Sequence, residues 1–135
     1  MTDRASRIGA GAAACSWGSM VVAFALWLRM ATPERRRPWL AAIMASEPFH
    51  VAAHLVLYGV LTALAWRATR RAWAAALAVA LFAVVQEGAQ SVWWGRAFER
   101  GEYFDLAVDS VAALIVLAAA TRAVRPARDL RPTAG

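Results

Sequence analysis

Carboxylate, amide, imidazole and guanidinium groups occur at a few positions inside or beside long apolar runs of this sequence. The candidates for a binding site are His54, Glu87, Gln90, Arg96, Asp105 and Asp109. Glu87 and Gln90 are three residues apart and Asp105 and Asp109 four, so each pair shares one face if its segment is helical. Such groups can bind the polar part of a ligand through charge-assisted hydrogen bonds.

Two histidines raise the alternative of a metal site. His50 and His54 are four residues apart and could ligate a metal ion, with Glu87 or Asp109 completing the set. The sequence contains no His-Glu-x-x-His motif, and its single cysteine, Cys15, lies in a different apolar run. A hydrogen-bonding role for His54 is therefore favoured, and we expect neither a metal nor another cofactor.

The same residues carry no signature of a known catalytic machinery. Ser91 is four residues from Glu87, but a serine with a carboxylate is not by itself a hydrolase signature. No other nucleophile stands beside a plausible base. The sequence favours binding over catalysis and leaves open an enzyme for lipid-linked substrates, with Glu87 and Asp109 as its acid and base.

Composition and charge pattern indicate a membrane protein of one domain. Of 135 residues, 61% are hydrophobic, and the charges cluster between uncharged stretches. These stretches are about 15 to 20 residues long, which is the length that crosses ~30 Å of hydrocarbon. All 15 basic residues are arginines at the segment ends, where they anchor helices and contact lipid phosphates. Membrane lipids are the expected partners, and no basic, aromatic-interleaved stripe suggests nucleic acid.

The predicted fold is an all-α, antiparallel up-down four-helix transmembrane bundle. The spans are expected at about 8–28, 48–66, 72–94 and 104–121, followed by a basic tail over 122–135.

Short connections set the order of these spans. Pro48 suits the first turn of a helix, where its missing N–H is not needed. Arg67 to Arg71 form a tight basic turn, which predicts an antiparallel hairpin of spans two and three. A polar loop is expected over 95–103 before span four. Both termini should then lie on the same side of the membrane.

Tryptophan and arginine positions place the bundle in a bilayer. Six of the seven tryptophans stand at predicted span ends: Trp27, Trp39, Trp66, Trp73, Trp93 and Trp94. Nine arginines lie on the side of the termini and six on the other, so the positive-inside rule puts both termini in the cytoplasm. The triple arginine at 35–37 opposes this orientation.

The layout brings the polar residues to one depth. Glu87 should be about 22 Å from the loop before its helix, hence roughly 8 Å beneath the opposite surface. The same rise per residue places His54 and Asp109 about 7 to 10 Å beneath that surface. Each would cost about 2 to 3 kcal/mol facing lipid, so these groups should face one another. Arg96 could clamp an anion or pair with Glu87 or Asp105, and Asp105 could instead be a helix N-cap.

Four short motifs resemble those of a known membrane family. They are His-Leu-Val-Leu-Tyr at 54–58, Glu-Gly-Ala-Gln at 87–90, Arg-Ala-Phe at 96–98 and Asp-Leu-Ala-Val-Asp at 105–109. Their order and spacing over about residues 47 to 120 resemble the VanZ-like family, small multi-pass membrane proteins named for a teicoplanin-resistance protein. His50 stands where that family usually has an acid, and Ala112 where it has a glycine.

The resemblance implies a protein of the bacterial inner (cytoplasmic) membrane, linked to glycopeptide resistance. Its six candidate residues would line a polar pocket near one membrane face. The pocket would bind a lipid headgroup, an envelope precursor or a lipophilic antibiotic. The alternative is a non-catalytic accessory subunit of a larger membrane complex. Small residues of span one favour that alternative because such faces dock other helices: Gly9, Gly11, Ser16, Gly18 and Ser19.

Overall fold

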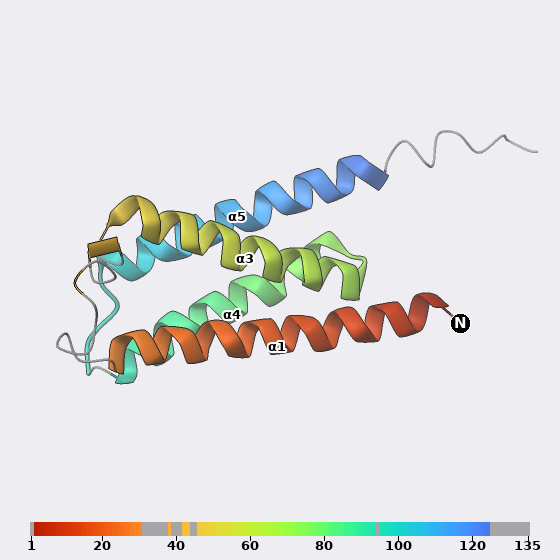
Figure 1. Cartoon of the computed structure of the whole chain (residues 1–135). Helices are drawn as coiled ribbons and strands as arrows, with labels where there is room; N and C mark the ends of the chain where they lie inside the picture. Colours follow the sequence, from red (N-terminus) through yellow and green to blue (C-terminus); the bar gives the residue numbers. More distant parts are fainter. Residues whose placement is uncertain (1, 31–37, 39–41, 44–45, 94, 125–135) are drawn as a thin grey trace, which may run out of the picture.

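The protein folds into four long α-helices (Figure 1). The computed structural model describes residues 2–30, 38, 42–43, 46–93 and 95–124. The helices are α1 (Thr2–Met30), α3 (Glu47–Thr69), α4 (Ala72–Trp93) and α5 (Arg100–Val124). The described part of the chain contains no strand. Each of the four helices is long and apolar enough to cross a membrane, so the all-α, multi-pass prediction is confirmed.

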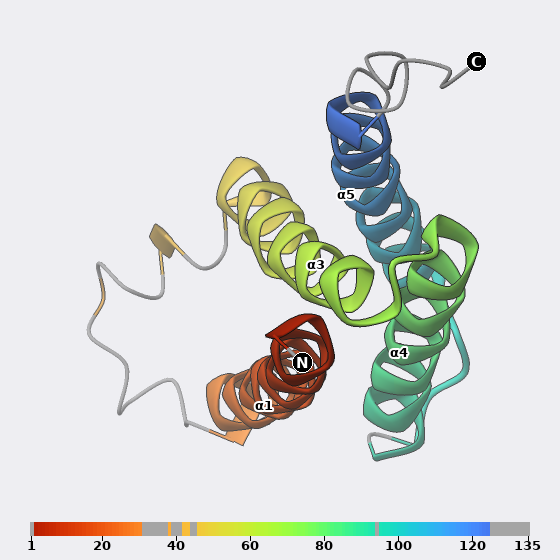
Figure 2. The same ribbon diagram turned by 90° about the vertical axis from the view of Figure 1, so that its right-hand side faces the viewer.

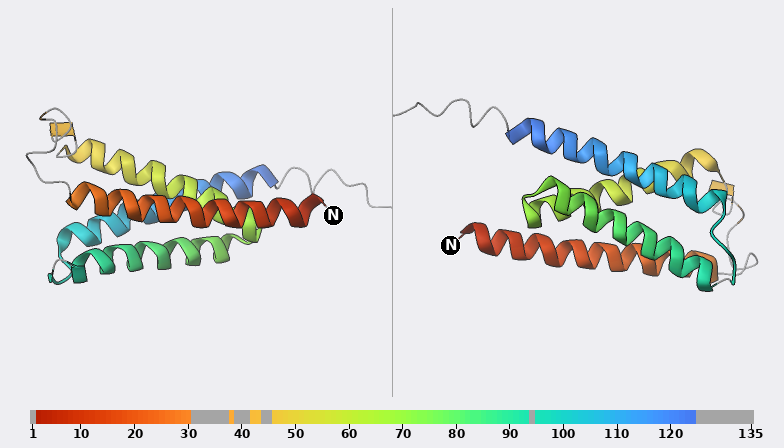
Figure 3. Two further views of the ribbon diagram at one scale, coloured as in Figure 1. Left: turned by 60° about the horizontal axis from the view of Figure 1, so that its bottom comes forward. Right: turned by 180° about the vertical axis from the view of Figure 1, so that it is seen from behind.

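Helix α3 occupies the middle of the bundle and packs against each of the other three helices (Figure 2). Two side-chain hydrogen bonds attach α1 to it. Arg7 Nε donates to the carbonyl of Ala68 at 3.0 Å, and Trp17 Nε1 donates to that of Leu57 at 2.9 Å. The end of α1, the start of α3, the end of α4 and the start of α5 gather at one end (Figures 1 and 3). The membrane side on which each terminus lies stays a prediction.

A two-residue turn joins α3 to α4. Arg70 adopts a left-handed conformation with φ of 56°, and its N–H donates to the carbonyl of Trp66 at 2.7 Å. A left-handed residue after the last turn ends a helix and satisfies one of its free carbonyls. The Arg70 guanidinium also lies 5.4 Å from the centre of the Trp66 ring, which holds the turn against the helix.

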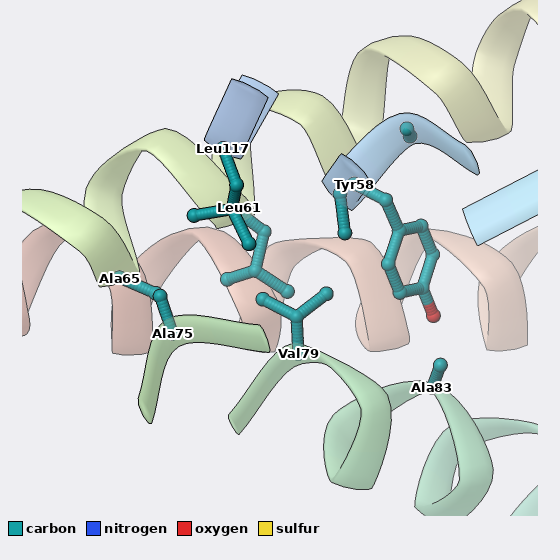
Figure 4. Packing of buried hydrophobic residues seen from close by; sticks show 9 residues of the cluster. Tyr58, Leu61, Ala65, Ala75, Val79, Ala83 and Leu117 are labelled. Atoms are coloured by element: carbon teal, nitrogen blue, oxygen red, sulfur yellow. The ribbon is translucent and has the colours of Figure 1, made fainter. Parts of the chain in front are cut away.

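The apolar core is built largely from small side chains where α3, α4 and α5 meet. Its buried members are Tyr58, Leu61, Ala65, Ala75, Val79, Ala83, Ala112, Ala113 and Leu117. Figure 4 shows Leu61, Val79 and Leu117 pointing toward one another, with Ala65 beside Ala75. Alanines at these positions let the helix backbones approach closely, which is how helices associate in a membrane. Larger apolar residues, such as Val85, Leu114 and Ile115, are exposed on the outside.

Helices α1 and α5 begin several residues earlier than predicted, whereas α4 begins at Ala72 as predicted. We expected α1 from residue 8 and α5 from residue 104, but they begin at Thr2 and Arg100. Residues 100–103 are therefore helical and not part of the loop. Hydropathy marks where a segment becomes apolar, whereas a helix begins where its backbone is capped. The arginine run at 35–37 and most of the basic tail, 125–135, lie outside the described residues.

Candidate functional site

Two histidine–aspartate pairs join the first turns of α3 to α5. His50 Nε2 lies 2.8 Å from Asp105 Oδ1, and His54 Nδ1 lies 2.8 Å from Asp109 Oδ1. The second pair is the deeper one, with side-chain exposures of 13% for His54 and 2% for Asp109. The His50 side chain is 45% exposed, so the first pair lies at the opening of the site.

A second set of hydrogen bonds continues from α3 to α4. The Tyr58 hydroxyl donates to Gln86 Oε1 at 3.1 Å, and Gln86 Nε2 donates to Glu87 Oε1 at 3.2 Å. All three side chains are buried. In Figure 4 the Tyr58 hydroxyl points away from Leu61 and toward the side of Ala83. Tyr58 therefore marks the boundary between the apolar core and the polar site.

The periodicity of α3 explains why these groups meet. His50, His54 and Tyr58 follow one another at intervals of four, so one face of the helix is polar for three turns. The His54 ring lies 4.6 Å from the His50 ring and 5.9 Å from the Tyr58 ring between centres. Polar groups on a membrane helix are costly unless partnered, so this face turns toward the acids and amides of α4 and α5.

A cavity of about 260 Å³ opens beside these groups. The residues that give this polar cavity its hydrogen-bonding wall are His50, His54, Tyr58, Gln86, Glu87, Gln90 and Asp105. The rest of its lining is apolar and comes from α1 and α3: Val21, Phe24, Ala25, Phe49, Ala53 and Leu57. The cavity therefore offers a ligand both hydrogen-bonding groups and apolar surface.

The structure brings five of the six predicted site residues together. His54, Glu87, Gln90 and Asp105 line the polar cavity, and Asp109 holds His54 from behind. Glu87 and Asp109 point into the bundle, as expected for buried acids. Asp105 is the sixth residue of α5, so the alternative that it caps the helix is wrong.

Arg96 lies elsewhere. Its guanidinium is 3.4 Å from Glu102 and 3.9 Å from Glu99, neither of which we expected as its partner, and it does not line the polar cavity. The early start of α5 is the reason. Glu102 stands in the first turn and accepts the N–H of Glu99 at 3.0 Å, as the acid of a capping box does. Arg96 is drawn to this capped helix start.

Three site residues were not in the predicted set: His50, Tyr58 and Gln86. The four-residue spacing with His54, which raised His50 only as a possible metal ligand, was the signal that could have identified both His50 and Tyr58. Gln86 had a weaker signal, since it is adjacent to Glu87 on the helix and would ordinarily face another direction. The Gln86 amide nevertheless bonds both Tyr58 and Glu87.

Two buried polar atoms have no hydrogen-bond partner within the described residues: Ser91 Oγ and Asp109 Oδ2.

Comparison with known proteins adds no further guide to the site. The chain matches no protein-family model, no curated protein and no solved structure. The resemblance to the VanZ-like family stays a prediction based on the four motifs.

Proposed function

We propose that this protein is a VanZ-like protein of the bacterial cytoplasmic membrane that binds the polar head of an amphiphile. The ligand class comprises a lipid headgroup, an envelope precursor or a lipophilic glycopeptide-type antibiotic. One observation carries this proposal: the lining of the polar cavity combines hydrogen-bonding side chains with apolar side chains of α1 and α3. This mixed lining suits a ligand with a polar head and an apolar tail.

The size and chemistry of the cavity narrow the ligand group. About 260 Å³ is room for a headgroup or a sugar, not for a whole antibiotic. Among the described residues, the cavity lining contains the carboxyl groups of Glu87 and Asp105 and no arginine or lysine. This charge balance favours a cationic ligand group that donates hydrogen bonds, such as an ammonium.

A second cavity offers a place for the apolar part of such a ligand. It measures about 630 Å³ and lies between α1 and the α3–α4 hairpin. Its lining is apolar or small, including Gly18, Leu61, Val79 and Phe82. Helix α1 borders both cavities, so an acyl chain lying along this helix would connect them.

The test is antibiotic susceptibility in a host that depends on this protein for protection. Glu87→Gln and Asp109→Asn remove one charge each and preserve side-chain size, so both should abolish protection while membrane abundance stays unchanged. A lost charge-assisted hydrogen bond of about 1.5 to 3 kcal/mol corresponds to roughly 10- to 100-fold weaker binding. Glu99→Gln, at an exposed acid outside the cavity, is the matched control. Unchanged susceptibility with both cavity variants would refute the polar cavity as the functional site.

The alternative of an accessory subunit loses part of its motivation. A methyl group added at Gly18 would lie 3.0 Å from the Phe82 ring, and one at Gly11 would lie 3.9 Å from Ala68. Gly18 and Gly11 thus serve packing of α1 within the chain, whereas Gly9, Ser16 and Ser19 are exposed and still favour the alternative. Extraction in mild detergent followed by sizing distinguishes the two functions, because a particle of one chain argues against a larger complex.

A further inference from the structure

Three side chains at the opening of the polar cavity form a set of metal ligands. His50, His54 and Asp105 each offer one ligand atom, and these atoms all lie within 4.8 Å of one another. Ligand atoms on a tetrahedral zinc ion are about 3.4 Å apart, since each lies 2.0 to 2.2 Å from the metal. The His50 Nε2–Asp105 Oδ1 distance of 2.8 Å and the 4.8 Å limit for the whole set lie on either side of that spacing.

Asp109 supplies the support that metal-binding histidines usually have. Ligating imidazoles donate their other N–H to a carboxylate, which fixes the tautomer and the ring orientation. His54 Nδ1 lies 2.8 Å from Asp109 Oδ1, and Asp109 is itself almost fully buried. With the proton held on Nδ1, the Nε2 lone pair of His54 is the one left for an ion.

An ion bound by these three side chains would keep one coordination position open toward the mouth of the cavity. His54 is largely buried, whereas the His50 side chain is 45% exposed at the cavity mouth. Two imidazoles and one carboxylate provide three protein ligands, and the fourth position of such a site is typically taken by water or a ligand group. This set suits zinc and related transition ions better than Mg²⁺ or Ca²⁺, which prefer oxygen ligands.

We propose that the protein binds one divalent transition ion, zinc being the first candidate, through His50, His54 and Asp105, with Asp109 as a positioning residue. A His-Glu-x-x-His motif, which the sequence lacks, places both histidines and the acid on one helix. Here the carboxylate comes from α5, 55 residues away from its histidine. The three ligands also line the polar cavity, but metal binding needs no organic ligand there and can be measured separately from the proposed function.

Zinc titration of the purified, tag-free full chain tests this proposal. After treatment with a chelator, calorimetry with ZnCl₂ should show about one ion per chain. Cobalt(II) should give the visible absorption of a tetrahedral site. His50→Gln and Asp105→Asn should each abolish both signals, and Glu99→Gln, an exposed acid outside the set, should leave them unchanged. Helicity by circular dichroism and elution volume establish that each variant is folded.

Asp109→Asn separates positioning from mere structural support. It should weaken zinc binding about 10- to 100-fold and shift the cobalt spectrum while helicity is retained. Absence of zinc binding by the folded protein, or binding that persists in both ligand variants, would overturn the proposal. Neither result affects the susceptibility test with Glu87→Gln, because Glu87 is not a ligand.

Discussion

Along α3, the first three turns contact carboxyl and amide side chains, whereas the later turns contact alanine, valine and leucine. His54 and Tyr58 represent the polar half, with partners on α5 and α4. Leu61 and Ala65 represent the apolar half, and they pack against small residues of the same two helices. One helix thus uses two different means of holding the same neighbours.

The two halves should respond to different kinds of substitution. In a membrane there is little hydrophobic driving force between helices, so the apolar half depends on close contact between surfaces. The polar half depends on each buried group having a partner, because an unpaired one is costly in hydrocarbon. Shape therefore matters most in one half and chemical identity in the other.

The largest effect is expected from Asp109→Ala in the polar half. Removing the carboxylate leaves His54 buried without its partner, which should lower the free energy of unfolding by about 2 to 3 kcal/mol. Unfolding in detergent, followed by circular dichroism, measures it. Asp3→Ala is the control, because Asp3 is exposed and its ion pair with Arg70 is a long one of 3.9 Å. Its effect on the free energy of unfolding should stay within about 0.5 kcal/mol.

Ala75→Leu should have the next largest effect and probes the apolar half. Ala75 is completely buried beside Ala65, so three more carbon atoms would force α3 and α4 apart. We expect a loss of about 2 kcal/mol in the same unfolding assay. Ala80→Leu adds the same group at an exposed position of α4 and should be close to neutral. If Ala75→Leu proved harmless, the apolar half would not depend on close contact.

Tyr58→Phe should have the smallest effect, because it removes one neutral hydrogen bond at the boundary of the two halves. The ring keeps its packing, and only the bond to Gln86 is lost, so we expect a loss of about 1 kcal/mol. Tyr103→Phe, at an exposed tyrosine of α5, is the control. An effect larger than that of Asp109→Ala would reverse the ranking and make Tyr58 the main polar contact.

The sequence predicted the four helices because their uncharged runs have the length of a membrane span. The turn at Arg70 was also foreseeable, because a cluster of arginines separates two apolar runs. The start of α5 was not. Arg100 and Glu102 are charged, so hydropathy assigns them to a loop, yet the Glu102 carboxylate caps the backbone at Glu99 and extends the helix.

The sequence predicted which residues converge at the site. It did not predict which side chains form hydrogen bonds with each other. Spacing and depth placed His54, Glu87 and Asp109 together because each avoids lipid. The choice of Asp109 as the partner of His54, and of Glu102 as a partner of Arg96, depends on the rotation of α5 about its axis. The same rotation also directs Ala112, Ala113 and Leu117, in the turns that follow Asp109, into the apolar core.

Both histidine–aspartate pairs join residues 55 positions apart, so the spacing of four on α3 matches the spacing of four on α5. A shift of α5 along α3 by one helical turn, about 5.4 Å, would bring Asp105 beside His54. His50 and Asp109 would then each lack their hydrogen-bond partner. The two pairs together therefore allow only one alignment of the parallel helices α3 and α5 along their axes.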